Sequence, residues 1–383
     1  MPSGALFLLF AGLAVGLLQA IETDRLARRA AAAAVCIVAA AVTAIVAIAT
    51  FAPDPDRFAQ TRLTERATAA ANAVAEADPA TTLILVVGAS RSHFGLRKDV
   101  LEQALAAQGR HSTVVKLTLP GADTFQRLEM LRVLARHLPE GSASAFRVVV
   151  LFELQENYDT LPLTFWRELR QAWTPEALQS TDVHNAALVV ASYLGSSQVR
   201  DTGTFITLLG HIAANATGAG RLAPTPAGRD EPRPRNLRLI EPPALDSRPA
   251  ANAAVVKQAL AGFATDLAAE EARQPVAFTG WKRDLVEPLM LGALPFDDLR
   301  IGYFNTPSLK AGDYRHARTW CASLDGAACL YFGRVDWLAD AQFAHERNWR
   351  DPGHMLSEVS TAWTLWLAGR LAGSGLMGSP LRP

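Results

Sequence analysis

Two short stretches at opposite ends of the chain hold residue types that together perform acyl transfer. The first, LILVVGASRSHFG (83–95), carries Ser90 directly after a run of apolar residues. The second, DPGH (351–354), carries Asp351 and His354 three positions apart. A serine hydroxyl is a weak nucleophile until an imidazole removes its proton, and a carboxylate then orients and stabilises that imidazole. The three side chains predict a catalytic triad, provided that the fold brings Ser90 next to His354.

Parts of this set also have a purely structural explanation. Asp351 followed by Pro352 is typical of a helix start, with Asp as the N-cap and Pro at the first helical position. That explanation leaves His354 without a role, and Ser90 elsewhere in the chain favours the triad instead. Ser92 is a competing nucleophile, disfavoured because it lies two residues further from the end of the expected strand.

The order and spacing of these residues resemble the SGNH (GDSL-like) hydrolase superfamily. In that family the nucleophile follows the first strand in a Gly-Asp-Ser-like block, and Asp-x-x-His lies near the C-terminus. The matching blocks here are GASRS (88–92) and DPGH (351–354). The α/β-hydrolase elbow, Gly-x-Ser-x-Gly, fits less well because position 92 is Ser. The resemblance covers about 80–375 and implies Ser90 as nucleophile, His354 as general base and Asp351 as orienting acid.

The resemblance also implies an oxyanion hole, in which donors face the negative oxygen of a tetrahedral intermediate. The donors are the N–H of Ser90, a glycine N–H after the second strand and an Asn after the third. Gly121 matches the second donor, although a turn glycine explains it equally well. The third block departs from the family's Gly-x-Asn-Asp, since the chain reads FELQENYD (152–159). Asn157 is the remaining candidate, further past the strand than the family pattern has it.

Three more residues are candidates for substrate binding, each with an ordinary alternative. Arg91 suits an anionic glycan or carboxylate, or else an ion pair with an acid of the protein. His93 lies three residues from Ser90 and either contacts substrate or caps the local chain. Trp349 stands just before Asp351 and either faces the cleft or belongs to the core.

The composition argues against nucleic acid and metal as partners. Acidic and basic residues number 37 each, so no basic excess is present to neutralise phosphates. Among the three cysteines no C-x-x-C pair occurs, so we expect no zinc site, and no cofactor is implied. Cys36 lies in an apolar run and is interpreted as packing. Cys321 and Cys329 flank a short loop and predict either a disulfide in an oxidising compartment or two buried thiols.

The first 52 residues predict a transmembrane hairpin. Residues 4–21 and 30–52 are apolar runs, each long enough to span a bilayer as a helix. Three arginines lie between them and no Lys or Arg precedes them, so the positive-inside rule places the connecting loop in the cytoplasm. A signal peptide would need a positive n-region instead. We therefore expect a bacterial inner-membrane anchor with everything after Phe51 outside, in the periplasm of a Gram-negative cell. If the first run is instead an interfacial helix, or if the start of translation is wrongly assigned, the residues after Phe51 are still expected outside. The reason is that the second run begins beside Arg28 and Arg29.

The exported part predicts an α/β domain after a helical stalk at 53–80. Near-continuous Val, Leu and Ile strands separated by helices indicate a parallel sheet covered on both faces. The expected strands are 83–87, 113–119 and 146–154, and the expected helices are 97–108, 124–138, 251–272 and the end of 351–373. With the resemblance, we expect a three-layer α/β/α flavodoxin-like SGNH fold over 81–375. A Pro-rich stretch at 216–250 predicts an irregular insertion, interpreted as a lid.

These expectations combine into one hypothesis about function and one alternative. Membrane-tethered members of the family commonly act on acyl groups of envelope or exopolysaccharide glycans, often beside a multi-spanning acyltransferase. The resemblance thus implies a membrane-anchored serine esterase or O-acyltransferase that acts on an acyl group, acetyl above all, of an extracytoplasmic glycan. The alternative is a catalytically inactive SGNH-fold scaffold that binds polysaccharide or an export partner. The missing Gly-x-Asn-Asp block favours the scaffold, and the retained Ser90, Asp351 and His354 oppose it.

Overall fold

The computed structural model describes residues 61–122, 124–154, 238–273, 292–322 and 329–378. The expected transmembrane hairpin at 4–21 and 30–52 lies outside these residues, as does Asn157. Within the ranges that are described, no helix is both long and apolar enough to cross a bilayer.

The centre of the protein is a five-stranded, wholly parallel sheet with strand order β2-β1-β3-β4-β5. This is the order of flavodoxin-like doubly wound sheets. The strands are β1 (Thr82–Gly88), β2 (Ser112–Thr118), β3 (Arg147–Glu153), β4 (Asp298–Phe304) and β5 (Cys329–Leu330). The register pairs Gly88 with Thr118, and Glu153 with Phe304. The residues that follow β1 to β4 therefore emerge at one edge of the sheet.

Helices cover both faces of this sheet. All seven residues of β1 are buried, and alternate residues face opposite sides, as the two-residue period of a strand requires. Leu83, Leu85 and Val87 pack in the cluster that includes α3 (Arg62–Ala75) and α6 (Thr124–His137). Ile84 and Val86 pack in the cluster on the other face. That cluster includes α5 (Lys98–Ala106), α12 (Ala253–Ala272), α15 (Arg334–Ala339) and α16 (Ser357–Gly373).

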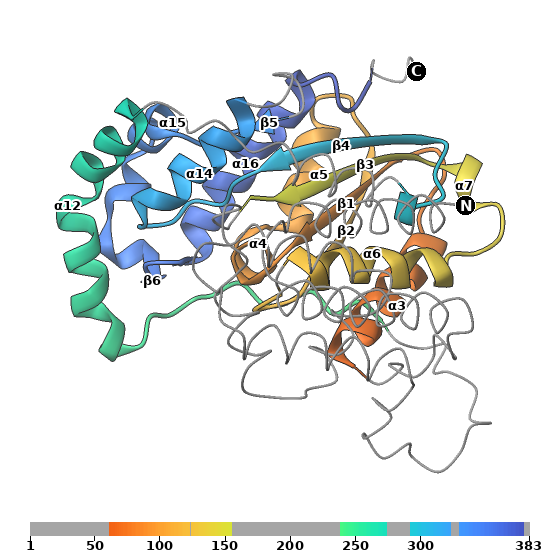
Figure 1. Ribbon diagram of the computed structural model, residues 1–383, viewed down its shortest axis with the longest axis horizontal. Helices are drawn as coiled ribbons and strands as arrows, with labels where there is room; N and C mark the ends of the chain where they lie inside the picture. Colours follow the sequence, from red (N-terminus) through yellow and green to blue (C-terminus); the bar gives the residue numbers. More distant parts are fainter. Residues whose placement is uncertain (1–60, 123, 155–237, 274–291, 323–328, 379–383) are drawn as a thin grey trace, which may run out of the picture.

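The remaining elements are short, except α14, whose Ala317 and Trp320 pack in the same cluster as α3 and α6. Figure 1 shows the strand arrows pointing toward the part of the molecule that holds α4, α12 and β6, while α3 and α6 lie together along one face. The elements other than the strands and helices named above are α4 (Ser90–Gly95), α7 (Ser142–Ala145), η2 (Ala250–Asn252), α14 (Ala311–Ala322), η4 (Ala341–Ala344), η5 (Glu346–Asn348), β6 (Trp349–Asp351) and β7 (His354–Met355).

The helix expected in the stalk is present as α3, but it is packed into the domain. Leu63, Ala67, Ala70 and Val74 are fully buried in the same cluster as α6 and the sheet. These positions are spaced three to four residues apart, so they form one face of the helix. Residues 62–75 therefore form part of the outer layer of the domain, where alanines allow two helices to approach closely.

The described part of the predicted insertion is irregular, as expected from its prolines. Residues 238–249 contain no helix or strand, and they run along the domain from the edge strand toward α12. Glu241 pairs with Lys116 of β2 at 3.2 Å, and the carbonyl of Leu245 accepts from the N–H of Ser357 at 3.0 Å. These contacts fix this end of the insertion to the β2 edge and to the start of α16.

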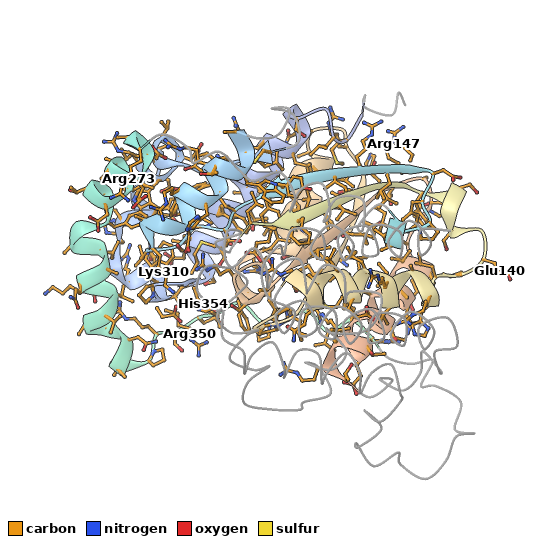
Figure 2. The ribbon with its side chains drawn as sticks, viewed as in Figure 1. Glu140, Arg147, Arg273, Lys310, Arg350 and His354 are labelled. Atoms are coloured by element: carbon orange, nitrogen blue, oxygen red, sulfur yellow. A yellow bond between two sulfur atoms is a disulfide. The ribbon has the colours of Figure 1, made fainter. Side chains whose placement is uncertain are left out.

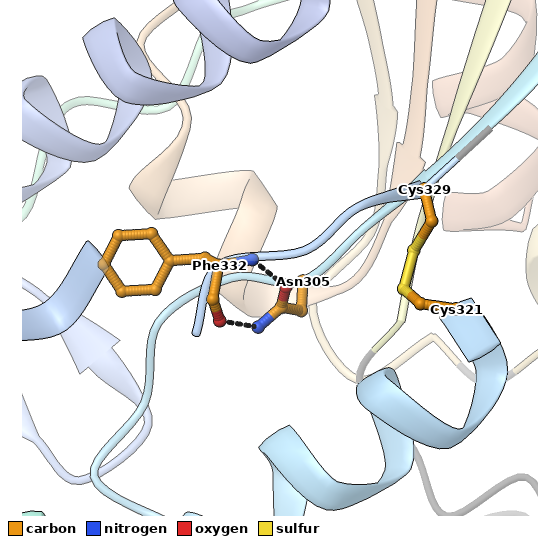
Figure 3. The surroundings of a disulfide bond; sticks show 4 residues. All are labelled: Asn305, Cys321, Cys329 and Phe332. Carbon is orange, nitrogen blue, oxygen red and sulfur yellow. Dashed lines mark hydrogen bonds between the residues drawn. A yellow bond between two sulfur atoms is a disulfide. The ribbon is translucent and has the colours of Figure 1, made fainter. Parts of the chain in front are cut away.

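A disulfide joins Cys321 at the end of α14 to Cys329 in β5, with their Cα atoms 5.4 Å apart. Of the two alternatives that the sequence leaves open, the structure contains the disulfide. Figure 3 shows Asn305 beside it. The Asn305 amide donates to the carbonyl of Phe332 at 2.9 Å and accepts from its N–H at 2.8 Å. The disulfide and this amide connect the short β5 strand to the neighbouring α14 and β4.

Candidate active site

Ser90 is the first residue of α4, directly after the carboxyl end of β1. Gly88 is the last residue of the strand, and Ala89 makes the turn between strand and helix. The first N–H groups of a helix have no partner within it, so helical hydrogen bonding does not use the N–H of Ser90. Ser90 is partly exposed, which suits a nucleophile that must meet a substrate.

Asp351 and His354 lie in a β-hairpin, and this corrects the helix-cap explanation of DPGH. Asp351 ends β6 and pairs in antiparallel register with His354, the first residue of β7. Pro352 and Gly353 form the turn between them. The next helix, α16, begins only at Ser357, with Leu356 as its N-cap. The three-residue spacing is thus that of a tight turn, which places the two side chains together.

The structure brings Ser90, His354 and Asp351 into one hydrogen-bonded chain. Ser90 Oγ lies 2.9 Å from His354 Nε2. His354 Nδ1 lies 2.9 Å from each carboxylate oxygen of Asp351. With an ionised Asp351, Nδ1 donates its proton to the carboxylate, and Nε2 is left to accept from the serine hydroxyl. Figure 2 shows His354 at the end of the molecule toward which the strands point, close to Arg350.

The surroundings of Asp351 favour its ionised form. Burial raises the pKa of this carboxyl, but several contacts outweigh burial and hold its pKa below the usual value. These are the hydrogen bond with His354, the N–H of Gly353 at 2.8 Å, the electrostatic interaction with the His354 ring and the positive charge of Arg350. The side chains of His354 and Asp351 are 26% and 30% exposed, so the pair faces a surface that substrate can reach.

Ser92 is excluded as the nucleophile because it is buried and differently bonded. It is 0% exposed, and its hydroxyl lies 2.7 Å from Oε2 of Glu153. Glu153 itself ends β3 and is also 0% exposed. Glu153 was not among the residues predicted from the sequence, in which a charged residue at the end of an apolar strand was the only signal for it.

Gly88 is required by space rather than by an unusual backbone angle. A Cβ at this position would lie 2.1 Å from the Ser92 hydroxyl oxygen and 2.4 Å from Oε2 of Glu153. Both distances are far shorter than van der Waals contact. The glycine of the GASRS block therefore lets the Ser92–Glu153 pair sit directly against the end of β1.

Arg91 is held in an ion pair within the protein, which was the second of the two expectations for it. Its Nη1 lies 2.6 Å from Oδ2 of Asp313 in α14. The Arg91 side chain is only 12% exposed. A Cβ added to Gly353 would lie 3.8 Å from Arg91 Nε, so Arg91 also borders the turn between Asp351 and His354. Its place suggests support for the site more than a contact with substrate.

His93 is bonded to the neighbouring strand and stays neutral. Its Nδ1 lies 2.9 Å from the hydroxyl of Thr118 at the end of β2. Burial, together with the nearby positive charges of Arg66 and Lys116, lowers the pKa of His93 to about 4. His93 therefore contributes a neutral ring to the wall beside α4, which agrees with a local structural role.

Trp349 belongs to the core, so the expectation that it faces the cleft is wrong. The side chain is 0% exposed, and its Nε1 donates to the carbonyl of Phe343 at 2.8 Å. The ring stacks on Trp337 at a centroid distance of 5.5 Å. Trp349 lies two residues before Asp351 in β6, and the strand register is irregular between these two residues, so the Trp349 ring is buried while Asp351 stays partly exposed.

Of the two other expected oxyanion donors, only Gly121 is described. It is exposed, with φ of +81°, in the turn that follows β2. The N–H of Leu119 in this turn donates to the carbonyl of Gly88 at 3.2 Å, so the turn is attached to the end of β1. Its positive φ suits glycine and explains the residue without chemistry. Asn157 lies outside the described residues.

No metal is implied by the side chains around the site. Among the described residues, no group of three or more His, Cys, Asp and Glu side chains is arranged to hold a metal ion. In comparisons with known proteins, no family model and no curated protein matches the chain.

Proposed function

We propose that this protein is a serine acyl esterase or O-acyltransferase in which Ser90 is the nucleophile, His354 the general base and Asp351 the orienting acid. The observation that carries the proposal is the continuous hydrogen-bonded chain from Asp351 through His354 to Ser90. Its members come from two distant parts of the sequence and meet at the carboxyl ends of a parallel sheet. Ligand sites of open α/β sheets lie at this edge.

The reaction proceeds in two acyl transfers. Ser90 Oγ attacks the carbonyl carbon of an ester while its proton passes to His354 Nε2. When the tetrahedral intermediate collapses, the bond to the alcohol oxygen breaks, and His354 returns the proton to the leaving alcohol. The acyl group is then attached to Ser90. Water or a sugar hydroxyl attacks it next, again losing a proton to His354, and Ser90 is regenerated with a free acid or a new ester as product.

The negative oxygen of the intermediate needs donors fixed in advance. The N–H of Ser90 is suited to this because it opens α4, where helical hydrogen bonding does not use it. Within the described residues, no hydrogen-bond acceptor is assigned to that N–H. The turn that carries Gly121 is bonded to the end of β1 and supplies a second backbone donor in this proposal.

The substrate class and location follow from the motif resemblance and the sequence pattern. The GASRS and DPGH blocks and the 2-1-3-4-5 strand order agree with an SGNH-type hydrolase fold over 81–375. The apolar runs at 4–21 and 30–52 would anchor this domain on the outer side of a bacterial inner membrane. The Cys321–Cys329 disulfide supports an oxidising compartment. We propose acyl groups of an envelope or exopolysaccharide glycan as substrate, with a multi-spanning acyltransferase as partner.

A fluorophosphonate probe on the full-length protein in detergent tests the proposal. The probe reacts covalently with an activated serine, so wild type should be labelled and Ser90→Ala should not. Ser247→Ala, at an exposed serine in the segment before α12, is the matched control and should label as wild type does. Absence of labelling in folded wild type would reject the esterase and favour the inactive scaffold. Labelling that survives in Ser90→Ala would assign the nucleophile elsewhere.

Acyl donor and acceptor assays then separate hydrolysis from transfer. An activated acetyl ester is supplied with and without oligosaccharide acceptors of the envelope. Release of free acetate alone identifies an esterase, whereas acetylated oligosaccharide identifies an O-acyltransferase. His354→Ala should abolish both, and His111→Ala, at an exposed histidine far along the chain from DPGH, should abolish neither.

A further inference from the structure

We propose that Glu153 is a positioning residue for the nucleophile: its buried carboxylate holds the turn that presents Ser90 to His354. This inference rests on the proposed function for its chemical meaning. The geometry behind it stands independently. Glu153 is 0% exposed, and Oε2 accepts from the N–H of Ala89 at 2.9 Å and from the hydroxyl of Ser92 at 2.7 Å.

These two contacts lie on either side of the nucleophile. Ala89 immediately precedes Ser90, and Ser92 follows it by two positions in α4. The hydroxyl of Ser92 also lies 3.3 Å from the carbonyl oxygen of Ala89. The turn therefore has an internal contact in addition to its bonds with Glu153. The carboxylate thereby fixes the entry of the chain into α4. The direction of the Ser90 Cα–Cβ bond follows from this entry.

Glu153 is itself held from two sides. The hydroxyl of Thr306, just after β4, donates to Oε1. The guanidinium of Arg127 in α6 donates to the Glu153 carbonyl at 3.0 Å. A carboxylate with donors on both oxygens cannot rotate freely. The position of the turn that carries Ser90 is therefore fixed relative to the ends of β3 and β4.

The same segment after β4 also contacts the other half of the triad. The N–H of Leu309 donates to the carbonyl of Pro352 at 2.7 Å, in the turn between Asp351 and His354. Thr306 and Leu309 are three residues apart, so one short segment braces the Glu153–Ser90 side and the Asp351–His354 side together. This arrangement explains how two stretches far apart in sequence are kept within a hydrogen bond of each other.

The rate of fluorophosphonate labelling tests this role. Glu153→Ala removes both oxygens and should slow labelling about 100-fold, because a displacement of about 1 Å in a reacting group costs a factor of that size. Glu153→Gln keeps an amide oxygen for Ala89 and Ser92 and an NH₂ for the Thr306 oxygen. Its labelling rate should therefore stay within about fivefold of wild type, since its amide has both an acceptor and donors.

Glu102→Ala is the matched control. Oε1 of Glu102 accepts the N–H of Val114 at 2.7 Å, so it is another carboxylate that holds a backbone donor, but it lies in α5. It should label as fast as wild type even where it lowers the unfolding temperature. A folded Glu153→Ala variant that labels within threefold of wild type would overturn the inference. So would Glu153→Gln labelling as slowly as Glu153→Ala, because charge rather than hydrogen bonding would then be decisive.

Crystal structures of wild type and Glu153→Gln and Glu153→Ala keep the positioning role separate from the proposed activity. Displacement of Ser90 from His354 in the Ala variant, with the wild-type contact kept in the Gln variant, supports positioning even if wild type is never labelled. An intact Ser90–His354 contact in the Ala variant overturns it. If Glu153→Ala does not fold, Thr306→Val removes one donor to the carboxylate, and unchanged labelling and geometry there would also overturn the inference.

Discussion

Arg91, the residue after Ser90, forms an ion pair with Asp313 of α14, with 2.6 Å between Nη1 and Oδ2. Asp313 also accepts the hydroxyl of Ser308 at 2.6 Å, in the segment that follows β4. The helix that carries Ser90 is therefore attached by charge to α14, the helix that follows β4. Both side chains are largely withdrawn from water, which makes the pair stronger than a surface contact.

Asp313→Asn should destabilise the protein and slow Ser90 labelling. A hydrogen bond to a charged group contributes about 1.5–3 kcal/mol, and the variant leaves the mostly buried Arg91 without its anion. Urea unfolding measures the loss of stability, and the fluorophosphonate reaction measures the change at Ser90. Asp99→Asn breaks the more exposed pair with Arg97 and should cost less than about 1 kcal/mol. If the two variants lost the same free energy of unfolding, the Arg91–Asp313 pair would be no more important than an exposed ion pair.

Gly88→Ala should be poorly tolerated because the added methyl group has no room. It would stand against the Ser92 hydroxyl and the Glu153 carboxylate, which are held by other bonds. Overpacking of this kind costs about 1–3 kcal/mol and here should also displace the turn that carries Ser90. Thermal unfolding and the labelling rate report the two effects.

Gly369→Ala provides the contrast for Gly88. Gly369 lies in α16, and a Cβ there meets nothing within 4 Å. Alanine is a better helix former than glycine, so this variant should gain about 0.5–1 kcal/mol in stability. If both glycine variants behaved alike, steric crowding at Gly88 would not be the explanation.

Protonation of His93 should make the folded protein less stable in mild acid. Its pKa in the folded state is about 4, below the unfolded value of 6.5, so the unfolded chain binds the extra proton first. The stabilising effect of the neutral ring is complete above about pH 6.5 and is lost as the pH falls toward about 4. Urea unfolding at a series of pH values measures this slope.

His93→Gln should flatten that slope, because an amide can bond Thr118 without titrating in this range. His111→Gln, at an exposed histidine, should leave the slope unchanged. Identical slopes for His93→Gln and wild type between pH 4 and 6.5 would assign the acid sensitivity to other groups.

Removal of the Cys321–Cys329 disulfide should lower stability. The two cysteines are 8 positions apart, and closing a loop of this size contributes about 2–3 kcal/mol through the entropy of the unfolded chain. Unfolding of the Cys321→Ser/Cys329→Ser double variant measures this loss. Mass spectrometry of unreduced peptides detects the bond itself, and free thiols in protein purified from an oxidising compartment would contradict it.

Much of the fold could be predicted from local sequence patterns. The runs at 83–87, 113–119 and 146–154 are rich in Val, Leu and Ile, which is the pattern of strands buried on both faces, and the strands appear where expected. β5 escaped prediction because it has two residues, Cys329–Leu330, and its existence depends on pairing with β4. Likewise, burial of α3 depends on α6, a partner that its own Ala-rich sequence does not specify.

The sequence by itself determined which residue types were available for chemistry: Ser90 after a strand, and Asp351 and His354 near the C-terminus. Only the tertiary structure decided that they meet, that DPGH is a hairpin turn, that Trp349 is buried, and that Glu153 contacts the turn before Ser90. The physical reason is one of range. Strand and helix patterns arise from neighbours along the chain, whereas a polar side chain acquires its role from partners that the packed sheet brings within 3 Å or so of it.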